Sequence, residues 1–182
     1  MRITALVMSG GRGSRLGSVD KGSVKLCGKP MIAWVLDNLT NAGVDRVVVS
    51  VSRRSSTTLS LVRELYHHDV YISSGVGYVE DLSFALRLLT PRPLLTMPVD
   101  TPLITPDLII DFVRRGIGVG KPVVNMIGPF GYVGVTLFNG SMGDWSDVKY
   151  DTPLVMDVDT PEDLDKAKRL CSALLQSNHH SL

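Results

Sequence analysis

Residues 3–22 read ITALVMSGGRGSRLGSVDKG, an apolar run that passes directly into a glycine-rich stretch carrying arginine and lysine side chains. The run at residues 3–8 is short, apolar and bounded by glycines, which predicts a buried strand. Because glycine has no Cβ, the backbone N–H groups around it can approach a phosphate closely. The residues placed to do this are Ser9, Gly10, Gly11 and Gly13. The stretch therefore predicts a strand that ends in a phosphate-binding loop.

The loop departs from the two familiar phosphate-binding patterns. A P-loop reads G-x-x-x-x-G-K-[ST], and here Ser23 stands where that pattern requires lysine. A dinucleotide-binding loop reads G-x-G-x-x-G, which would put its third glycine at Leu16, but Gly17 comes one residue late. A glycine-rich turn without a ligand would leave Arg15 and Lys21 unexplained. We therefore expect a phosphate loop of another type.

Strand-like and helix-like segments alternate along the chain. The predicted strands are residues 3–8, 46–52, 69–73, 93–100, 121–127, 132–138 and 153–159. The predicted helices are residues 29–43, 55–68, the later part of 73–89, 105–115 and 160–175. This alternation is typical of a Rossmann-like three-layer α/β/α sandwich with a mostly parallel sheet, and the two strands near 122–138 predict a local antiparallel insertion.

Composition limits the class of protein and its partners. The 182 residues, of which 44% are hydrophobic, suit one domain, expected over 1–177, with a polar tail at 178–182. A net charge of +1 favours neither nucleic acid nor an acidic membrane as a partner. Membrane-spanning runs and a signal-peptide pattern are absent from the sequence. Cys27 and Cys171 match neither a metal knuckle nor a disulfide framework, so we expect ordinary thiols in a reducing, cytoplasmic setting.

Three ordered motifs carry a family resemblance. They are SGGRGSRLG with DKGSVKLCGKPMI (residues 9–17 and 20–32), PVDTPLITPDLI (98–109) and DVDTPEDL (157–164). In this order they resemble the MobA-like NTP transferase superfamily, whose fold is similar to that of the nucleotide-diphospho-sugar transferases. The resemblance implies transfer of a nucleoside monophosphate from a nucleoside triphosphate, with release of pyrophosphate.

Two members of the superfamily compete for the closest resemblance, and both use GTP. The segments KLCGKPMI (25–32) and SGVGYVEDLSFAL (74–86) resemble the archaeal-type adenosylcobinamide-phosphate guanylyltransferase of cobalamin biosynthesis. The segment LGSVDKG (16–22) resembles molybdenum-cofactor guanylyltransferase, whose acceptor is molybdopterin. We favour the cobinamide enzyme because of GYVEDL (77–82). A GTP-binding regulatory module without turnover is the alternative of another class.

The resemblance and the chemistry of the side chains together give the expected nucleotide site. The expected nucleotide contacts are Met8, Ser9, Gly10, Gly11, Gly13, Ser14, Arg15, Lys21, Ser52, Gly77, Glu80, Asp81 and Asp100. Arg15 offers a planar fork of donors to the β- or γ-phosphate, and Lys21 a compact charge to the α-phosphate, so these two are the expected catalytic residues. Outside the motif, either side chain would be read as a solvated surface cation.

Carboxylates at the carboxyl ends of predicted strands indicate a metal site. Asp100 and Asp159, with Asp157 as a weaker member, are the expected ligands of Mg²⁺, which prefers carboxylates together with phosphate oxygens. Asp159 is alternatively a cap of the last helix. The acceptor phosphate is already ionised near neutral pH, so no general base is needed, and no histidine lies near a motif. Catalysis would rest on positioning and charge neutralisation.

The remaining motif segments suggest how base and acceptor are recognised. Glu80 or Asp81 would accept hydrogen bonds from the N1–H and N2–H₂ groups of guanine, unless they only favour a helix N-terminus. Ser52 is a second candidate for the wall of the base-binding site. The segment 130–150, with Tyr132, Phe138 and Trp145, is the expected acceptor side, although these aromatics would also suit a core or a homodimer contact.

Overall fold

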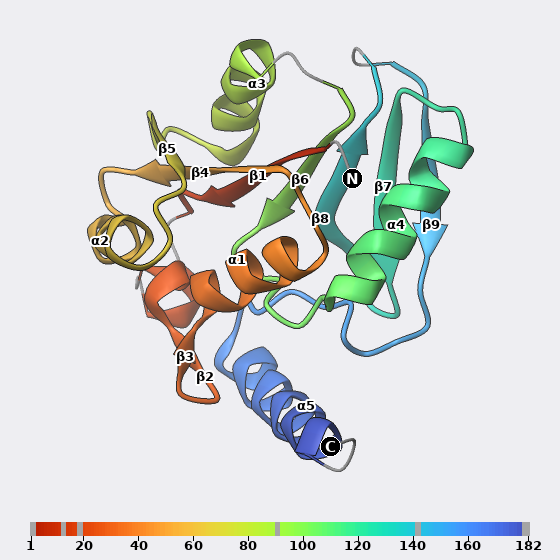
Figure 1. The fold of residues 1–182 in the computed structure, drawn as a ribbon. Helices are drawn as coiled ribbons and strands as arrows, with labels where there is room; N and C mark the ends of the chain where they lie inside the picture. Colours follow the sequence, from red (N-terminus) through yellow and green to blue (C-terminus); the bar gives the residue numbers. More distant parts are fainter. Residues whose placement is uncertain (1–2, 12–13, 18–19, 90–91, 141–142, 180–182) are drawn as a thin grey trace.

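A seven-stranded sheet forms the centre of the molecule (Figure 1), in the strand order β5-β4-β1-β6-β8-β7-β9. The structure is a computed structural model and describes residues 3–11, 14–17, 20–89, 92–140 and 143–179. The strands β1 (Thr4–Ser9), β4 (Arg46–Ser52), β5 (Asp69–Ser73) and β6 (Leu94–Pro98) pair in parallel. The predicted mostly parallel sheet is confirmed.

The second half of the sheet contains the reversal. Strand β8 (Gly131–Phe138) pairs antiparallel with β6 on one side and with β7 (Val123–Gly128) on the other. The edge strand β9 (Trp145–Lys149) returns to parallel pairing with β7. The predicted antiparallel insertion is therefore confirmed, and the reversed strand brings residues 131–134 to the carboxyl end of β6.

Helices cover the two faces of the sheet unequally. Helices α1 (Met31–Asn41), α2 (Ser56–Leu65) and α4 (Pro106–Gly118) pack on one face, and α3 (Tyr78–Leu88) lies on the other (Figure 1). Strand β1 is buried throughout because it packs on both faces of the sheet: Ala5 and Val7 join the core under the three helices, and Leu6 and Met8 join the core under α3.

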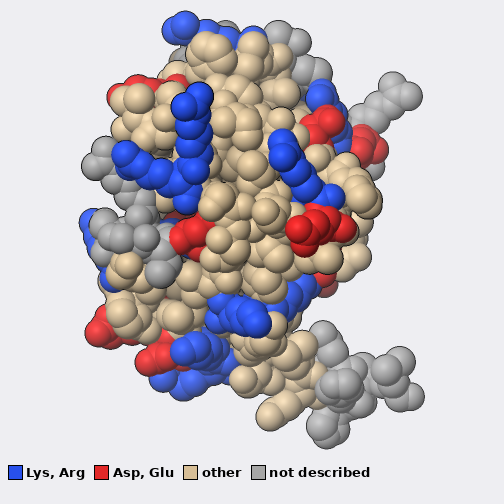
Figure 2. All heavy atoms as spheres, turned by 90° about the vertical axis from the view of Figure 1, so that its left-hand side faces the viewer, with Lys and Arg blue, Asp and Glu red and all other residues tan. Residues whose placement is uncertain are grey.

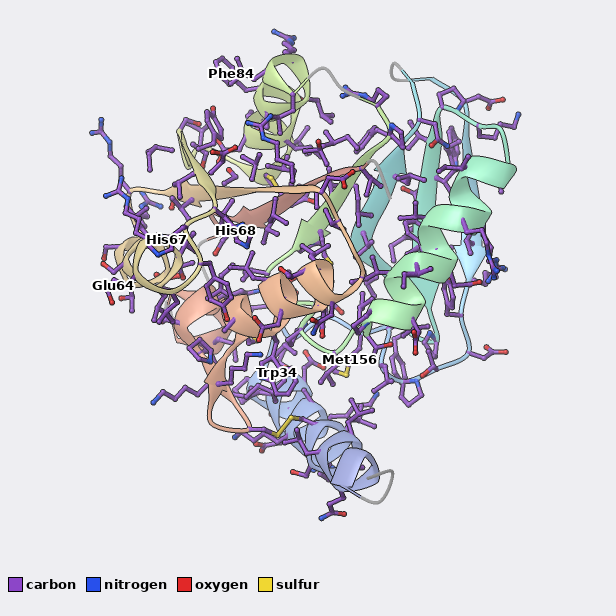
Figure 3. All side chains as sticks on the ribbon, viewed as in Figure 1. Trp34, Glu64, His67, His68, Phe84 and Met156 are labelled. Atoms are coloured by element: carbon purple, nitrogen blue, oxygen red, sulfur yellow. A yellow bond between two sulfur atoms is a disulfide. The ribbon has the colours of Figure 1, made fainter. Side chains whose placement is uncertain are left out.

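The last helix packs away from the sheet. Helix α5 (Pro161–His179) forms its own small core with a short hairpin, β2 (Lys25–Leu26) and β3 (Lys29–Pro30), that follows the phosphate loop. Trp34 of α1 donates a hydrogen bond from Nε1 to the Leu26 carbonyl oxygen at 2.9 Å. Figure 3 shows Trp34 and Met156 beside α5. The helix continues to His179, past the boundary expected at residue 177.

In the C-terminal part, one predicted strand is wrong and one strand was not predicted. Residues 153–159 are buried in part but have irregular backbone, with a turn in which the Val155 N–H donates to the Thr152 carbonyl oxygen at 3.2 Å. An apolar run indicates that a segment is buried. Because irregular segments can be buried as well as strands, the run does not identify a strand. Conversely, β9 was not predicted, because Trp-Ser-Asp-Val-Lys has only one fully buried side chain, Val148.

The expectation of free thiols is also wrong. Cys27, in the β2–β3 turn, and Cys171, in α5, form a disulfide with their Cα atoms 6.5 Å apart. The yellow sulfur–sulfur bond is visible beside α5 in Figure 3. The two cysteines are 144 residues apart, and their sequence positions do not indicate that they pair. The packing of the hairpin on α5 brings them together.

The distribution of surface charge agrees with the net charge of +1. Figure 2 shows basic and acidic side chains interspersed on the face that lies to the left in Figure 1. Within the described residues, no helix combines the length and the apolarity that crossing a bilayer requires.

Reduction of the disulfide should destabilise the protein. The bond closes a loop that contains most of the chain, and restraint of such a loop in the unfolded state contributes roughly 2–4 kcal/mol. We expect the free energy of unfolding in urea to fall by about this amount when dithiothreitol is added. The Cys27→Ser variant is the control, because its stability should no longer respond to the reductant. Equal stability of the wild type with and without dithiothreitol would contradict the expectation.

Candidate active site

The loop after β1 opens into a cavity of about 290 Å³ at the carboxyl ends of β1 and β6. It is lined by the loop, by the turn before α3 and by the end of β6: Met8, Ser9, Gly10, Gly11, Lys21, Gly75, Val76, Gly77, Tyr78, Asp81, Pro98, Val99 and Asp100. The structure thus brings together eight of the expected nucleotide contacts, from Met8 to Asp100. Gly13 lies outside the described residues, and Ser14 begins the short η1 helix (Ser14–Leu16).

Lys21 is the charged centre of this rim. It begins the short η2 helix (Lys21–Ser23), and its Nζ lies 2.8 Å from Oδ2 of Asp100 and also pairs with Asp159. Only 14% of the Lys21 side chain is exposed. Burial opposes the charge of Lys21, but Asp100 and Asp159 together outweigh it, so the pKa of Lys21 is raised. Lys21 therefore stays protonated.

Neighbouring residues fix the backbone around Lys21. The Asp20 carboxylate accepts hydrogen bonds from the N–H of Thr58 at 2.8 Å and from its hydroxyl at 2.5 Å, which ties the loop to α2. A Cβ at Gly22 would lie 2.4 Å from Oγ1 of Thr58, so only glycine allows this close approach. The sequence Asp-Lys-Gly (residues 20–22) thus directs the lysine toward the carboxylates.

The carboxylates themselves have perturbed protonation. Burial raises the pKa of Asp100, Lys21 opposes that rise, and Asp159 and Asp157 add to it. Burial and the charge of Asp159 likewise raise the pKa of Asp157. Arg15, whose side chain is 72% exposed, pairs with Asp159 at 3.0 Å. Two cations and three carboxylates therefore meet where the loop, β6 and the start of α5 converge.

Two of these carboxylates, those of Asp100 and Asp159, are arranged as a pair that would suit a divalent cation. Oxygens of Asp100 and Asp159 both contact the single Nζ atom of Lys21, so they converge on one point, as carboxylates that share a Mg²⁺ ion do. In the described part of the chain, no group of three metal-ligating side chains is arranged around one point. That Asp157 joins the pair stays a prediction: its charge acts on Asp100, but the strand alternation assumed for it does not exist at residues 153–159.

The two carboxylates expected to recognise the base, those of Glu80 and Asp81, have different positions. Asp81 is buried, lines the cavity and accepts hydrogen bonds from the Ser74 hydroxyl at 2.6 Å and the Gly75 N–H at 3.1 Å, which holds the turn before α3. Glu80 is exposed, and its carboxylate covers Gly77, where a Cβ would lie 2.3 Å from Oε2. Within the described residues, Asp81 alone of the two faces the cavity.

Ser52 lies behind the loops rather than in the cavity wall. Its Cβ is 3.1 Å from the position that a Cβ on Gly75 would take, and its hydroxyl is 3.3 Å from that of Ser55. The Ser55 hydroxyl in turn donates to the carbonyl oxygen of Ser9 at 2.7 Å. Ser52 therefore packs beneath the phosphate loop, and the expectation that it forms a wall is not met.

Tyr78 is a cavity residue that the sequence analysis did not single out. It begins α3, and its neighbour across the cavity is the end of β6 at Pro98 to Asp100. Burial and the charge of Asp100 raise its pKa to about 12, so its hydroxyl remains a neutral donor. Its position directly after Gly77 in GYVEDL was the available signal, because a helix that starts at the sheet rim directs its first turn at the ligand.

The aromatic residues expected on the acceptor side have different environments. Phe138 is buried against α3, and Phe130 lies under the ammonium of Lys166, 3.3 Å from the ring centre. Tyr132 donates a hydrogen bond to Asp147 at 3.0 Å. Trp145 is 63% exposed at the edge of a second cavity. The prediction of an open aromatic rim therefore applies to Trp145 and Tyr132, and Phe138 is core.

Comparison with known proteins places the chain among nucleotidyltransferases. Residues 5–142 match the family described as MobA-like NTP transferase domain. An adenosylcobinamide-phosphate guanylyltransferase of Methanocaldococcus jannaschii is 34% identical over 83 residues, 43% of this chain and 42% of that protein. A molybdenum cofactor guanylyltransferase of Acidovorax sp. is 32% identical over 129 residues, 70% of this chain and 59% of that protein. The chain spans about half the length of the curated relatives it matches.

Solved structures share the fold. Molybdopterin-guanine dinucleotide biosynthesis protein A from Archaeoglobus fulgidus has a TM-score of 0.73 at 19% identity, covering 93% of this chain and 99% of that one. The manganese complex of Rv0371c from Mycobacterium tuberculosis has a TM-score of 0.70 at 16% identity, with the same coverage. The expected fold is thereby confirmed. Because the family match spans most of the chain, including the phosphate loop and Asp100, the chain belongs to the MobA-like NTP transferase domain family.

Proposed function

We propose that this protein is a guanylyltransferase that moves GMP from GTP to adenosylcobinamide phosphate and releases pyrophosphate. The observation that carries the proposal is Lys21, held between Asp100 and Asp159 at the mouth of a glycine-lined cavity. The named relatives support guanylyl transfer. The corrinoid acceptor is favoured by the resemblance of GYVEDL (77–82) and by the identity to the Methanocaldococcus protein.

Asp100 and Asp159 would hold a divalent cation, and Mg²⁺ is the ion we expect. Both are acidic oxygen donors that already converge on one cation, the Lys21 ammonium. The manganese complex of a protein with the same fold supports the use of a divalent ion. When bound, such an ion neutralises phosphate charge and so stabilises the transition state of phosphoryl transfer.

The chain's own residues would position and neutralise the triphosphate. The backbone N–H groups of Gly10 and Gly11 line the cavity where the phosphates would lie. Arg15 is exposed, so it can leave Asp159 and donate to the departing pyrophosphate. Lys21 would contact the α-phosphate. An oxygen of the acceptor phosphate forms the new bond to the α-phosphorus, and the bond from that phosphorus to the bridging oxygen breaks, so pyrophosphate leaves with the electron pair.

Asp81 is the residue we propose for guanine selection. It is the buried carboxylate of the cavity, and its two oxygens have lone pairs beyond those used by Ser74 and Gly75. A carboxylate accepts from the N1–H and N2–H₂ groups of guanine, whereas adenine presents an acceptor at N1. Transfer to molybdopterin is the second candidate function, favoured by the Acidovorax relative that covers 70% of this chain.

The direct test is incubation with GTP, Mg²⁺ and adenosylcobinamide phosphate, followed by measurement of pyrophosphate. We expect release that requires all three components and that is much slower with ATP. Molybdopterin replaces the acceptor in a parallel reaction. Pyrophosphate release with molybdopterin but not with adenosylcobinamide phosphate would assign the second function. GTP binding without pyrophosphate release with either acceptor would indicate a regulatory module.

The Lys21→Ala variant should lose turnover rather than GTP affinity. Removal of one preorganised charge from the transition state costs roughly 10²–10³ in kcat. Because the variant leaves the buried Asp100 without its cation, it should also unfold more easily. The double variant Lys21→Ala with Asp100→Asn serves as the control, because it should recover stability but not activity. A large fall in GTP affinity with unchanged kcat would contradict the α-phosphate role.

The Asp100→Asn variant should lose the dependence of GTP binding on Mg²⁺. A neutral amide is a weaker ligand than a carboxylate for a hard dication. We expect Mg²⁺ with GTP to raise the melting temperature of the wild type but to add little to the effect of GTP alone in the variant. The matched control is Asp165→Asn, whose carboxylate is exposed on α5 and pairs with Lys168. Equal Mg²⁺ responses in wild type and Asp100→Asn would exclude this metal site.

A further inference from the structure

A second cavity of about 320 Å³ lies between α3 and the far strands of the sheet. Of the described helices, α3 alone packs on this face, and it covers the middle of the sheet and leaves strands β7 and β9 beside it (Figure 1). The wall on the α3 side is formed by Val79, Leu82 and Leu86, and the opposite side by Thr136, Phe138 and Trp145. We call this the α3 groove.

Strand alternation explains why the floor of the α3 groove has mixed polarity. Leu137 and Val124 point into the core under α4, so their neighbours Thr136 and Asn125 face the groove. The Thr136 hydroxyl donates to Oδ1 of Asn125 at 3.1 Å, and Asn125 Nδ2 donates to Asp147 at 3.3 Å. Because these polar groups bind one another, the floor accepts an apolar occupant without leaving them unpaired.

Helix α3 and strand β8 each run from the nucleotide cavity into the groove. Tyr78 lines the nucleotide cavity, and the next residue, Val79, lines the groove. On β8, Gly134 packs against the nucleotide cavity: a Cβ there would lie 2.8 Å from Pro98 Cγ and 3.9 Å from the Tyr78 hydroxyl oxygen, and its φ is +75°. The same strand then contributes Thr136 and Phe138 to the groove, and Phe138 lies roughly 13 Å from Gly134 at about 3.3 Å per residue.

We propose that the α3 groove binds the ring body of the acceptor while the acceptor phosphate reaches Lys21. This inference rests on the proposed function. A phosphorylated acceptor must place its phosphate at the nucleotide cavity and its body next to it, and α3 and β8 both lead from that cavity into the groove. Nothing in the described residues covers Val79 and Trp145, whose side chains are 68% and 63% exposed.

The lining favours a large apolar ring system with amide groups at its periphery, as a corrinoid has. Trp145 offers a face on which such a ring can stack, and the α3 side chains offer apolar contact along its length. A pterin is a smaller ring system with polar groups along its edge, so it would cover less of the apolar wall formed by Val79, Leu82 and Leu86.

Acceptor binding can be measured without turnover by equilibrium dialysis against adenosylcobinamide phosphate, followed by corrin absorbance. We expect Trp145→Ala and Val79→Asp each to weaken binding about tenfold or more, with no change in the stabilisation by GTP. The matched controls are Phe84→Ala and Leu88→Asp. These residues are also exposed on α3, but Phe84 stacks with Tyr71 and Leu88 adjoins Val70, away from the groove (Figure 3).

Each outcome supports or overturns the inference. Weaker binding confined to the groove variants supports it. Wild-type affinity in both groove variants would show that the acceptor is a corrinoid bound elsewhere. If the wild type does not bind adenosylcobinamide phosphate, the acceptor is not a corrinoid, and the proposal that a corrinoid occupies the α3 groove is refuted. A dimer in light scattering that Val79→Asp and Trp145→Ala, but not the control variants, dissociate would show that a second copy covers the groove.

Discussion

The ammonium of Lys21 between the carboxylates of Asp100 and Asp159 is the contact on which the site depends. It joins three segments that are far apart in the chain: the loop after β1, the end of β6 and the start of α5. Without a cation, the largely buried carboxylate of Asp100 would be costly at this position. The position of Lys21 is in turn fixed by its neighbours in the loop: Asp20 accepts hydrogen bonds from Thr58 of α2, and Gly22 leaves space for the Thr58 side chain.

The glycine loop, the turn before α3 and the α3 groove follow from the same topology. Parallel strands β1 and β6 bring the glycine loop and Asp100 side by side, and the turn before α3 closes the cavity from the other side. The reversed strand β8 then places Gly134 next to Pro98. One reversal in an otherwise parallel sheet thus makes β8 run from the nucleotide cavity toward the α3 groove, where we propose that the acceptor binds.

Sequence patterns anticipated the parts of the fold that rest on local chemistry. The apolar strands, the helix with Pro106 at its start and the glycine loop each have a physical reason within a few residues. Features that depend on contacts between distant segments were missed, including the Cys27–Cys171 bond and the turn at residues 153–159. At the site, Lys21, Asp100 and Asp159 were found because motifs name them, whereas Asp157 relied on a strand that is not there. Tyr78 was missed because, within GYVEDL, only the carboxylates of Glu80 and Asp81 have the chemistry expected for guanine recognition.

The disulfide between the hairpin and α5 has a topological consequence. Residues 28–170 lie between its two cysteines, and they include Asp100, Asp159 and six of the seven strands of the sheet. A single peptide-bond cleavage anywhere in that interval leaves both fragments in one covalent molecule. The β7–β8 turn, at residues 129 and 130, therefore lies where a protease can nick the oxidised protein without releasing either half.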